Sequence, residues 1–497
     1  MNLTRIARGL LAGLLGCAAV AVPATIGTAA AQADVSSTLV FAKNTEGHDC
    51  YRIPTVVKAN NGDLLAFAEG RNGGASTCND LGEIDLVLKR STDGGKTWGA
   101  VQTVIKANGD TKGNPAPIVV PGSNRVVLLS TMQCYTNPAC GRVPRVSLSE
   151  DNGKTWGAPR VLTTELGFAS APGWLATGPS HGIVLTRGAH AGRLVAGVSW
   201  TTGGKDTGAL VYSDDQGTTW HRGATDSPTT AINPQEISVT ELLDGRVYAA
   251  ARNQANDGDK CLAGGTRNRA FALSSDGGAT FSSKFAFATD LVAPTVQGST
   301  ARMSATDTGG RYNRVVFAAP STCDRRKELR VHSSFDEGAN WTGTAGSLLV
   351  WGQDAAYSDM VQLSPSSVGV LFEAGPELHA NDTIRYATVT DAALGAPACG
   401  LGYGVIDSAP LGTAGTAYLT YNAATGKNCV SAMKSANAGK ATQTSAFLEV
   451  QGSARVTDSG AFSYFAGPVA AAAADKCVKW GGAADGQAYT SGFEHCG

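Results

Sequence analysis

The sequence predicts an all-β protein: a six-bladed β-propeller followed by a small disulfide-stapled β domain. Two observations carry this prediction. One octapeptide recurs five times, and each copy follows a short β-like run. The copies start at Ser91, Ser149, Ser213, Ser274 and Ser334, so successive starts are 58, 64, 61 and 60 residues apart. A long, nearly constant period with strands in every unit is typical of radially repeated sheets.

The octapeptide has the chemistry of a hairpin turn. Its first copy, Ser91–Trp98, reads Ser-x-Asp-x-Gly-x-Thr-Trp. The Asp-Gly-Gly segment adopts positive φ at little cost, and the Ser and Asp side chains can accept hydrogen bonds from turn amides. Trp98 offers apolar area that can fix the turn against its neighbours. We therefore expect the octapeptides to be structural rather than ligand-binding.

The runs between octapeptides supply the strands of each unit. Five marked units and one unmarked unit give six blades, and we expect the N-terminal run to complete the last blade. The predicted strands are 38–42, 53–58, 63–69, 84–89, 116–120, 126–131, 145–149, 182–186, 193–199, 208–213, 237–242, 246–252, 269–273, 301–304, 313–319, 329–332, 357–363, 369–373 and 383–389.

The N-terminus has the pattern of a secretory signal peptide, residues 1–33. Arg5 and Arg8 precede an apolar segment that ends near Ala31-Gln32-Ala33, which predicts cleavage before Asp34. An alternative is lipoprotein attachment at Cys17. We expect a secreted, extracellular protein without membrane insertion, because no later apolar run reaches spanning length.

Composition and the absence of the octapeptide after residue 391 define the remaining domain boundaries, and composition also excludes one class of function. We expect the propeller at 35–391, a linker at 392–397 and the small C-terminal β domain at 398–497, where the octapeptide is absent. Charged residues are 16% of the chain and the net charge is −1, without a basic run, which argues against nucleic-acid binding.

Ten cysteines remain after Cys17, an even number that is compatible with disulfides in an exported chain. Nearest-neighbour pairing is our default: Cys50 with Cys78, Cys134 with Cys140, Cys261 with Cys323, Cys399 with Cys429, and Cys477 with Cys496. The seven histidines show no metal-ligand spacing, so we expect neither a metal nor a cofactor.

Several motifs in order make residues 36–391 resemble the exo-sialidase (neuraminidase) family. Tyr51-Arg52-Ile53-Pro54 opens the first unit, Asp80 precedes the strand-like run from Ile84, and the octapeptides match the family's repeats. The C-terminal segment is similar to small secreted actinobacterial proteins of the spore-associated type.

The resemblance implies a set of site residues. Tyr357 would be the nucleophile, Glu236 its base, and Asp80 the general acid and then base. Arg52, Arg252 and Arg326 would bind the substrate carboxylate, with Arg325 as an alternative to Arg326. Glu373 would hold Arg52, while Glu69 and Arg71 would face the 4-hydroxyl side of the sugar. Asn114 is a further substrate-binding candidate, at a position where relatives have an Asp-Pro pair.

Three guanidinium groups can bind the carboxylate of sialic acid, and their charge does not titrate. A neutral phenol can approach that carboxylate without charge repulsion, so retaining hydrolysis through a tyrosine is expected. The implied partners are sialylated glycans on glycoproteins or glycolipids, bound by a monomer without nucleic acid. Two alternatives are a non-catalytic glycan-binding propeller, against which Tyr357, Glu236 and Asp80 argue, and a trans-sialidase.

Overall fold

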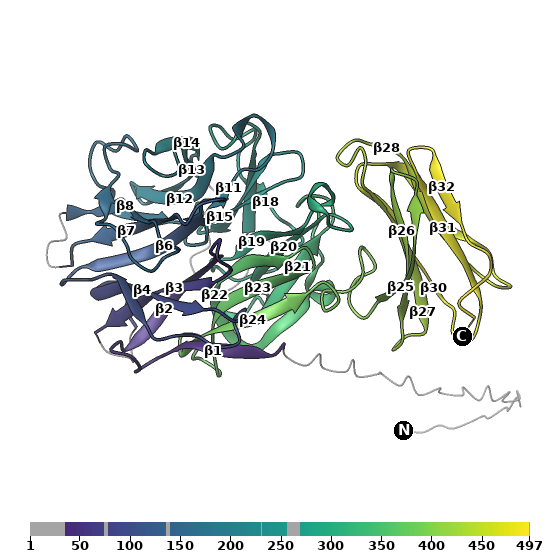
Figure 1. Cartoon of the computed structure of the whole chain (residues 1–497), viewed down its shortest axis with the longest axis horizontal. Helices are drawn as coiled ribbons and strands as arrows, with labels where there is room; N and C mark the ends of the chain where they lie inside the picture. Colours follow the sequence, from purple (N-terminus) through teal and green to yellow (C-terminus); the bar gives the residue numbers. More distant parts are fainter. Residues whose placement is uncertain (1–34, 74–77, 136–139, 230, 256–268, 497) are drawn as a thin grey trace, which may run out of the picture. The chain divides into compact units, whose positions relative to one another are not determined.

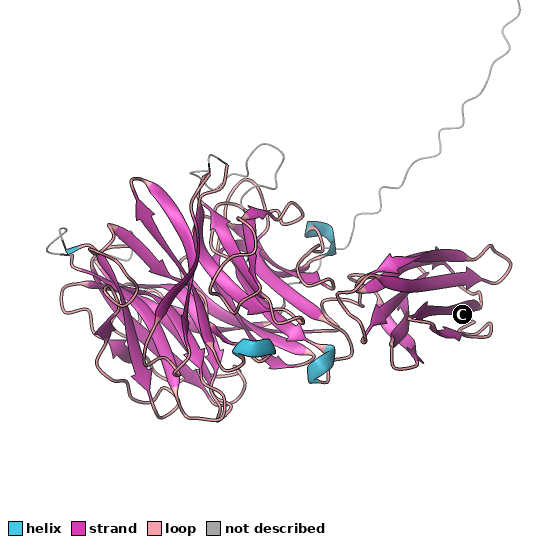
Figure 2. Ribbon diagram, turned by 90° about the horizontal axis from the view of Figure 1, so that it is seen from above, coloured by secondary structure: helices cyan, strands magenta, loops and turns pink. Residues whose placement is uncertain are grey.

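The computed structural model describes residues 35–73, 78–135, 140–229, 231–255 and 269–496, and these ranges form an all-β structure (Figures 1 and 2). The predicted signal peptide, residues 1–33, and Cys261 lie outside the described residues. The helical segments whose residues are all described are three short 3-10 turns, at Gly188–His190, Thr306–Thr308 and Thr344–Gly346. The predicted all-β class is therefore confirmed.

The chain runs through successive antiparallel units, each with three or four neighbouring strands followed by a loop. The first two units share one sheet, joined by a parallel pair between Ile84 and Thr111. Their strands are β2 (Cys50–Lys58), β3 (Leu64–Asn72), β4 (Glu83–Ser91), β5 (Gln102–Ile105), β6 (Thr111–Val119), β7 (Val126–Gln133), β8 (Arg142–Ser149) and β9 (Arg160–Val161).

The next two units form separate sheets. One contains β10 (Trp174–Thr177), β11 (Ile183–Val184), β12 (Leu194–Thr202), β13 (Lys205–Ser213) and β14 (His221–Asp226). The other contains β15 (Pro234–Glu241), β16 (Val247–Asn253), β17 (Arg269–Ser274) and β18 (Ala286–Phe287).

A seven-stranded sheet follows, in the order β1-β24-β23-β22-β21-β20-β19. Its strands are β19 (Ser299–Ser304), β20 (Arg314–Pro320), β21 (Lys327–Ser334), β22 (Leu348–Ser364), β23 (Ser367–Gly375), β24 (Thr383–Thr390) and β1 (Ser37–Ala42). Strand β1 pairs antiparallel with β24, as expected for the N-terminal run.

The strands between octapeptides lie close to their predicted positions, but edge strands were missed. Strands β5, β14 and β18 are short, partly exposed segments after an octapeptide, so they lack a buried alternating pattern. The predicted strand 182–186 is wrong in length, because only Ile183–Val184 pairs with β12. Strand β10 supplies the neighbouring pairing instead.

All five octapeptides close by the same hydrogen bonds. In the first, Ser91 Oγ accepts from the Gly95 N–H at 2.8 Å and donates to Asp93 Oδ1, which also accepts from the Thr97 N–H at 2.9 Å. The later copies repeat the Ser-to-Asp and Gly-to-Ser bonds. Hydrogen bonds from Thr97 and Ser91 lower the pKa of Asp93 to about 2. These carboxylates thus serve the turn.

A buried carboxylate connects three of the sheets. Asp359 on β22 is fully buried and accepts four hydrogen bonds of 2.9 to 3.0 Å. The donors are the Val56 N–H on β2, the Ser180 hydroxyl, and both the N–H and Nδ1 of His181. Burial alone would lower the pKa of His181, but the Asp359 carboxylate raises it overall.

The C-terminal region has its own sheets and core. One sheet contains β25 (Gly404–Leu411), β26 (Gly415–Asn422), β27 (Lys427–Lys434) and β30 (Phe465–Ala472). The other contains β28 (Thr442–Val450), β29 (Val456–Phe462), β31 (Val478–Ala484) and β32 (Gln487–Thr490). A hydrophobic cluster that includes Leu419, Val430, Leu448 and the fully buried Trp480 belongs to these strands.

Four of the five predicted disulfides are confirmed: Cys50–Cys78, Cys134–Cys140, Cys399–Cys429 and Cys477–Cys496. The fifth predicted pair includes Cys261 and so falls partly outside the described residues. Within the described ranges, no helix has the length and hydropathy needed to cross a membrane.

Candidate active site

Four of the ten candidate residues, Arg52, Asn114, Glu236 and Tyr357, lie where a strand bulges. The antiparallel register shifts at Arg52–Thr55 in β2, Gly113–Ala116 in β6, Gln235–Ile237 in β15 and Ala355–Ser358 in β22. Ile53, Asn114 and Glu236 have positive φ values of 58°, 51° and 49° at three of these bulges. Because a bulge redirects side chains, four separate strands can present polar groups where a regular strand would not.

Tyr357 and Glu236 form a direct pair. The Tyr357 hydroxyl donates a hydrogen bond to Glu236 Oε1, although the residues are 121 positions apart. Arg252 Nη1 donates to Glu236 Oε2 at 2.9 Å and to the Tyr357 oxygen at 3.2 Å. The Glu236 carboxylate therefore accepts the phenolic proton of Tyr357. The Arg252 guanidinium donates to the other Glu236 oxygen and to the phenolic oxygen.

Arg52, Arg252 and Arg326 converge on the Tyr357 phenol. Burial and the Glu236 carboxylate raise the pKa of Tyr357, whereas the positive charges of these three arginines oppose that rise. The guanidinium of Arg52 also lies over the tyrosine ring, 5.3 Å from its centroid. Strands β2, β16 and the residue preceding β21 thus bring three cations to one hydroxyl group.

Glu373 fixes one of these arginines. This carboxylate on β23 is fully buried and accepts from Arg52 Nε at 2.7 Å and Nη2 at 3.2 Å. It also accepts from the backbone N–H groups of Ile53 and Tyr357 at 2.9 and 3.1 Å. Burial alone would lower the pKa of Arg52, but Glu373 raises it. Glu373 therefore orients Arg52 and Tyr357 together.

The two candidate arginines 325 and 326 have different surroundings. Arg325 forms ion pairs with Glu377 at 2.7 Å and Asp354 at 3.3 Å. Arg326 Nη2 donates to the Thr295 carbonyl at 3.0 Å, and its charge acts on Tyr357. The geometry therefore favours Arg326 as the member of the arginine group.

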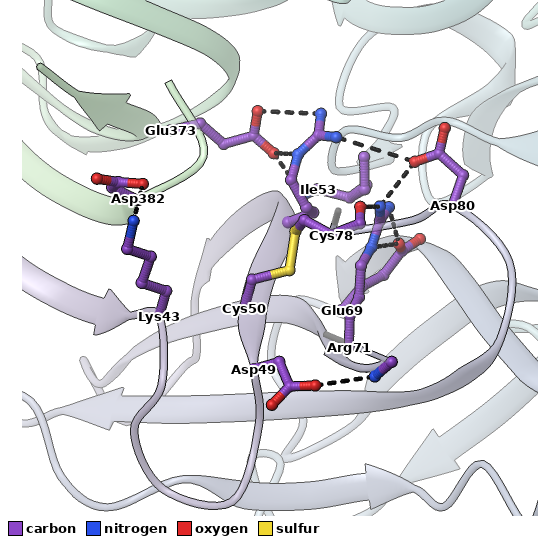
Figure 3. The surroundings of a disulfide bond; sticks show 12 residues. Lys43, Asp49, Cys50, Ile53, Glu69, Arg71, Cys78, Asp80, Glu373 and Asp382 are labelled. Atoms are coloured by element: carbon purple, nitrogen blue, oxygen red, sulfur yellow. Dashed lines mark hydrogen bonds and ion pairs between the residues drawn. A yellow bond between two sulfur atoms is a disulfide. The ribbon is translucent and has the colours of Figure 1, made fainter. Parts of the chain in front are cut away.

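Asp80 lies on the loop between β3 and β4, with its side chain 81% exposed (Figure 3). Arg71 Nη1 donates to Asp80 Oδ1 at 2.7 Å and to the Cys78 carbonyl at 2.7 Å. Desolvation alone would raise the pKa of Asp80, but Arg71 and Arg52 lower it overall. In the substrate-free protein the geometry therefore favours the carboxylate form.

The Cys50–Cys78 disulfide ties this loop to the neighbouring strand. Cys50 begins β2 two residues before Arg52, and Cys78 lies two residues before Asp80. Figure 3 shows the disulfide beside the bonds that Arg71 makes to Cys78, Glu69 and Asp80. A covalent link and one arginine thus hold the loop that carries Asp80.

Glu69 and Asn114 lie next to this loop. Glu69 Oε2 accepts from Arg71 Nε at 3.0 Å, and its Oε1 accepts from the Asn114 N–H at 2.9 Å. The Asn114 side-chain oxygen accepts from the Thr131 hydroxyl at 3.2 Å. Both candidates are buried and already have partners within the protein.

Sequence reasoning missed one residue of this group, Arg142. It begins β8, and burial lowers the pKa of its guanidinium. The carboxylates of Glu69, Asp80 and Glu236 oppose this shift, and the charge of Arg71 adds to it. The loops between the second and third strands of a unit also carry Asp80 and Arg326. Its position directly after the corresponding loop of the second unit is therefore the signal that could have identified it.

Comparison with known proteins places residues 62–370 in the family described as BNR repeat-like domain. The sialidase of Micromonospora viridifaciens is 30% identical over 371 residues, which are 70% of this chain and 53% of that protein. The chain thus spans about half the length of this curated relative. The structure titled Hadza microbial sialidase Hz136 is 23% identical, with a TM-score of 0.60 over 71% of this chain and 68% of that one.

The C-terminal region has a separate relative. Spore-associated protein A of Streptomyces coelicolor is 40% identical over 84 residues, which are 17% of this chain and 54% of that protein. Both resemblances inferred from the sequence motifs are thus supported. The family match covers more than half of the chain, and this protein therefore belongs to the BNR repeat-like domain family.

Proposed function

We propose that the protein is a secreted exo-α-sialidase that hydrolyses terminal sialic acids from glycoconjugates with retention of configuration. The observation that carries this proposal is the Tyr357–Glu236 hydrogen bond inside a group of three arginines. A glycan-binding site would use the arginines, but it would not require a phenol paired with a carboxylate base.

The arginines bind the substrate carboxylate. Arg52, Arg252 and Arg326 supply charge-assisted donors from three strands or strand ends, and Glu373 fixes Arg52. This fixes the anomeric carbon, which carries that carboxylate, next to the Tyr357 oxygen. Glu69 and Arg71 lie beyond Asp80 and contact the far side of the sugar ring.

Tyr357 attacks the anomeric carbon as Glu236 takes its proton. The raised pKa of Tyr357 keeps the phenol protonated in the resting protein, so the hydrogen bond to Glu236 provides the path for that proton. Arg252 donates to a Glu236 oxygen and to the Tyr357 oxygen, so it stabilises the negative charge that develops on the phenolic oxygen as its proton leaves.

Asp80 protonates the leaving oxygen and then activates water for the second displacement, which gives net retention. Its exposed position on a loop suits contact with the leaving group. The carboxylate must be protonated for the first step. Arginine charges lower the pKa of Asp80, so its protonated, competent form is lost at a lower pH than that of a free aspartate.

We propose that the units of residues 35–391 close into a six-bladed propeller. The fifth residue of each octapeptide packs against the preceding unit: a Cβ at Gly153 would lie 2.8 Å from Leu65, and one at Gly217 would lie 2.8 Å from Val127. A Cβ at Gly95 would lie 2.1 Å from Tyr386 on β24, so the first octapeptide contacts the last unit. This contact and the β1–β24 pairing support closure of the ring.

We also propose that residues 392–397 are a linker to an independent domain at 398–497, and that residues 1–33 are a removed signal peptide. The disulfides support an oxidising, extracellular location. The partners are sialylated glycans on glycoproteins or glycolipids, and the active species is a monomer without a cofactor.

The Asp80→Ala variant should lose activity in proportion to the need for acid assistance. On a sialoside with a sugar leaving group we expect kcat/KM to fall about 10²- to 10⁴-fold. On a phenolic leaving group of low pKa the loss should stay under about tenfold, because little protonation is needed. Steady-state kinetics on both substrates measure the difference, and equal losses would contradict the assigned role.

Removing the Cys50–Cys78 disulfide should produce the same pattern more weakly. In a Cys50→Ala, Cys78→Ala variant the Asp80 loop loses its covalent link, so kcat on the sugar leaving group should fall about tenfold. The matched control is Cys399→Ala, Cys429→Ala, which opens a loop of similar length, 30 against 28 residues. The control should lose stability only; equal kcat losses in both variants would exclude this positioning role.

Release of free sialic acid from a fluorogenic α-sialoside by the purified protein tests the proposed function. We expect turnover by the intact protein and none by the Tyr357→Phe variant. Tight binding of sialylglycans without release would instead identify a glycan-binding module.

A further inference from the structure

The C-terminal region contains a group of three metal-ligating side chains. Asp407 lies on β25, and Glu494 and His495 lie in the segment after β32. Their ligand atoms, two carboxylate oxygens and one imidazole nitrogen, all lie within 4.8 Å of one another. Among the described residues this is the one group of three or more such side chains with that spacing. Histidine spacing in the sequence could not reveal it, because Asp407 and His495 are 88 positions apart.

The protein holds each carboxylate of this group mainly through one oxygen. Asp407 Oδ1 accepts from the Ser408 N–H at 2.7 Å, and Glu494 Oε1 accepts from the Trp480 indole N–H at 2.7 Å. Asp407 Oδ2 faces His495 Nε2 at 3.0 Å, and Glu494 Oε2 has no hydrogen bond to a described residue. Outer hydrogen bonds of this kind orient a ligating carboxylate and leave its second oxygen for an ion.

The segment that carries Glu494 and His495 is fixed in place by other bonds. The Glu494 N–H donates to the Val478 carbonyl at 2.9 Å, and the Val478 N–H donates to the Glu494 carbonyl at 2.8 Å. The Cys477–Cys496 disulfide closes next to this pair. Because these bonds already order the backbone, an ion that binds here would have to order little more than side chains.

The group also carries negative charge without a lysine or arginine partner. Within the described ranges neither Asp407 nor Glu494 forms an ion pair with either residue type. Burial raises the pKa of Tyr489 on β32, and the charges of Glu494 and Asp407 raise it further. The side chains of His495 and Asp407 are 31% and 40% exposed, so an ion can reach them from solvent.

We propose that Asp407, Glu494 and His495 bind one zinc ion, with water in the fourth position, and that the ion fastens the C-terminal segment to β25. Tetrahedral zinc holds nitrogen and oxygen ligands at about 2.0–2.2 Å, so its ligand atoms lie roughly 3.3 Å apart. The 3.0 Å between His495 Nε2 and Asp407 Oδ2 is already close to that separation. The imidazole ligand favours zinc over calcium and magnesium, which prefer a shell of oxygen ligands.

This site is independent of the proposed sialidase activity, because the candidate active-site residues all precede β25. Strand β25 is an edge strand of one sheet, whereas Val478, which pairs with Glu494, begins β31 of the other sheet. The ion therefore links the two sheets of the C-terminal region. Failure to bind zinc would leave the sialidase proposal unchanged, and absence of sialidase activity would leave the zinc site unchanged.

Calorimetric titration of the full chain with zinc chloride, after removal of metal by EDTA and desalting, tests the proposal. We expect one zinc ion per chain with a Kd of about 10 μM or tighter. Calcium or magnesium at about 1 mM should not displace the zinc. Zinc binding weaker than about 100 μM, or displacement by either of these ions, would overturn the proposal.

Two conservative variants separate metal binding from folding. Glu494→Gln and Asp407→Asn each lose a carboxylate but keep a side-chain oxygen that can accept from the Trp480 indole or the Ser408 N–H. Zinc affinity should fall about 100-fold in each variant. The melting temperature of the metal-free protein should stay within about 2 °C of the wild type. A change in affinity of less than about threefold in either variant would contradict the assigned ligands.

His379→Gln is the matched control for His495→Gln. His379 Nδ1 lies 3.7 Å from Asp382 Oδ1 and its side chain is 57% exposed, but no third ligand group accompanies this pair in the described part of the chain. His495→Gln should weaken zinc binding about 100-fold, and His379→Gln less than about twofold. Equal losses would identify non-specific binding to surface histidines and exclude the site.

Hydrogen exchange tests the proposed link between the sheets. In the wild type, zinc should slow exchange in the peptide that contains Glu494 and in the peptide that contains Asp407, because the ion holds both segments together. The same peptides of His495→Gln should exchange at the same rate with and without zinc. Equal rates with and without zinc in the wild type would show that the ion does not fasten the segment to β25.

Discussion

Replacing Tyr357 by phenylalanine should lower kcat about 10³-fold or more. The substitution removes the nucleophilic oxygen and the hydrogen bond to Glu236, while the ring that packs beneath Arg52 remains. The three arginines are retained, so KM should change much less than kcat. Steady-state kinetics on a fluorogenic sialoside measure both constants.

The matched control is Tyr386→Phe. Tyr386 is equally buried, but its hydroxyl has no hydrogen-bond partner among the described residues, and its ring packs on Trp98 of the first octapeptide. Activity of this variant should stay within about twofold of the wild type. A Tyr357→Phe variant that keeps kcat within tenfold of the wild type would contradict nucleophilic catalysis by the phenol.

Replacing Asp359 by alanine should have the largest effect on stability, a loss of about 3–5 kcal/mol in the free energy of unfolding. The substitution leaves four donors without an acceptor: two buried ones, at Val56 and Ser180, and two part-buried ones at His181. Denaturant titration followed by tryptophan fluorescence measures the change. Asp307→Ala removes an aspartate whose ion pair with Arg187 is partly exposed and should cost under about 1 kcal/mol. Similar losses in both variants would exclude a special role for Asp359.

The loss at Asp359 should also depend on pH. The folded protein raises the pKa of His181 above its usual value, so this contribution to stability is fully present below the unfolded pKa. It disappears as the pH rises through the folded pKa. The difference between wild type and Asp359→Ala should therefore be larger near pH 5.5 than near pH 9. An equal difference at both values would show that the charge of His181 does not contribute.

The octapeptides made the repeat predictable from sequence, because their Ser, Asp and Gly residues satisfy one turn locally. The inner strands were also predictable, since they are almost continuously buried runs rich in apolar residues and bounded by turn residues. The short outer strands, such as β18, were not, because two partly exposed residues carry no periodic pattern. The predicted length of the 182–186 strand was wrong for a similar reason, because its pairing depends on β12 and not on its own residues.

The site candidates were found through ordered motifs, and the structure places Arg52, Glu236, Tyr357 and Glu373 together. The bulge at Glu236 was not predictable, because a bulge is defined by the register of the partner strand. Arg142 was missed for another reason. A single arginine at the start of a strand resembles a solvated surface charge until its burial is known.

Identification of the residue that becomes covalently attached to the sugar tests the central claim most directly. A fluorinated sialosyl donor with a good leaving group slows both displacements but lets the first proceed, so the intermediate accumulates. Peptide mass mapping after incubation should place one added sialosyl group on Tyr357. The Tyr357→Phe variant should remain unmodified. A modified Glu236 or Asp80, or turnover without any adduct and with inversion at the anomeric carbon, would contradict the account.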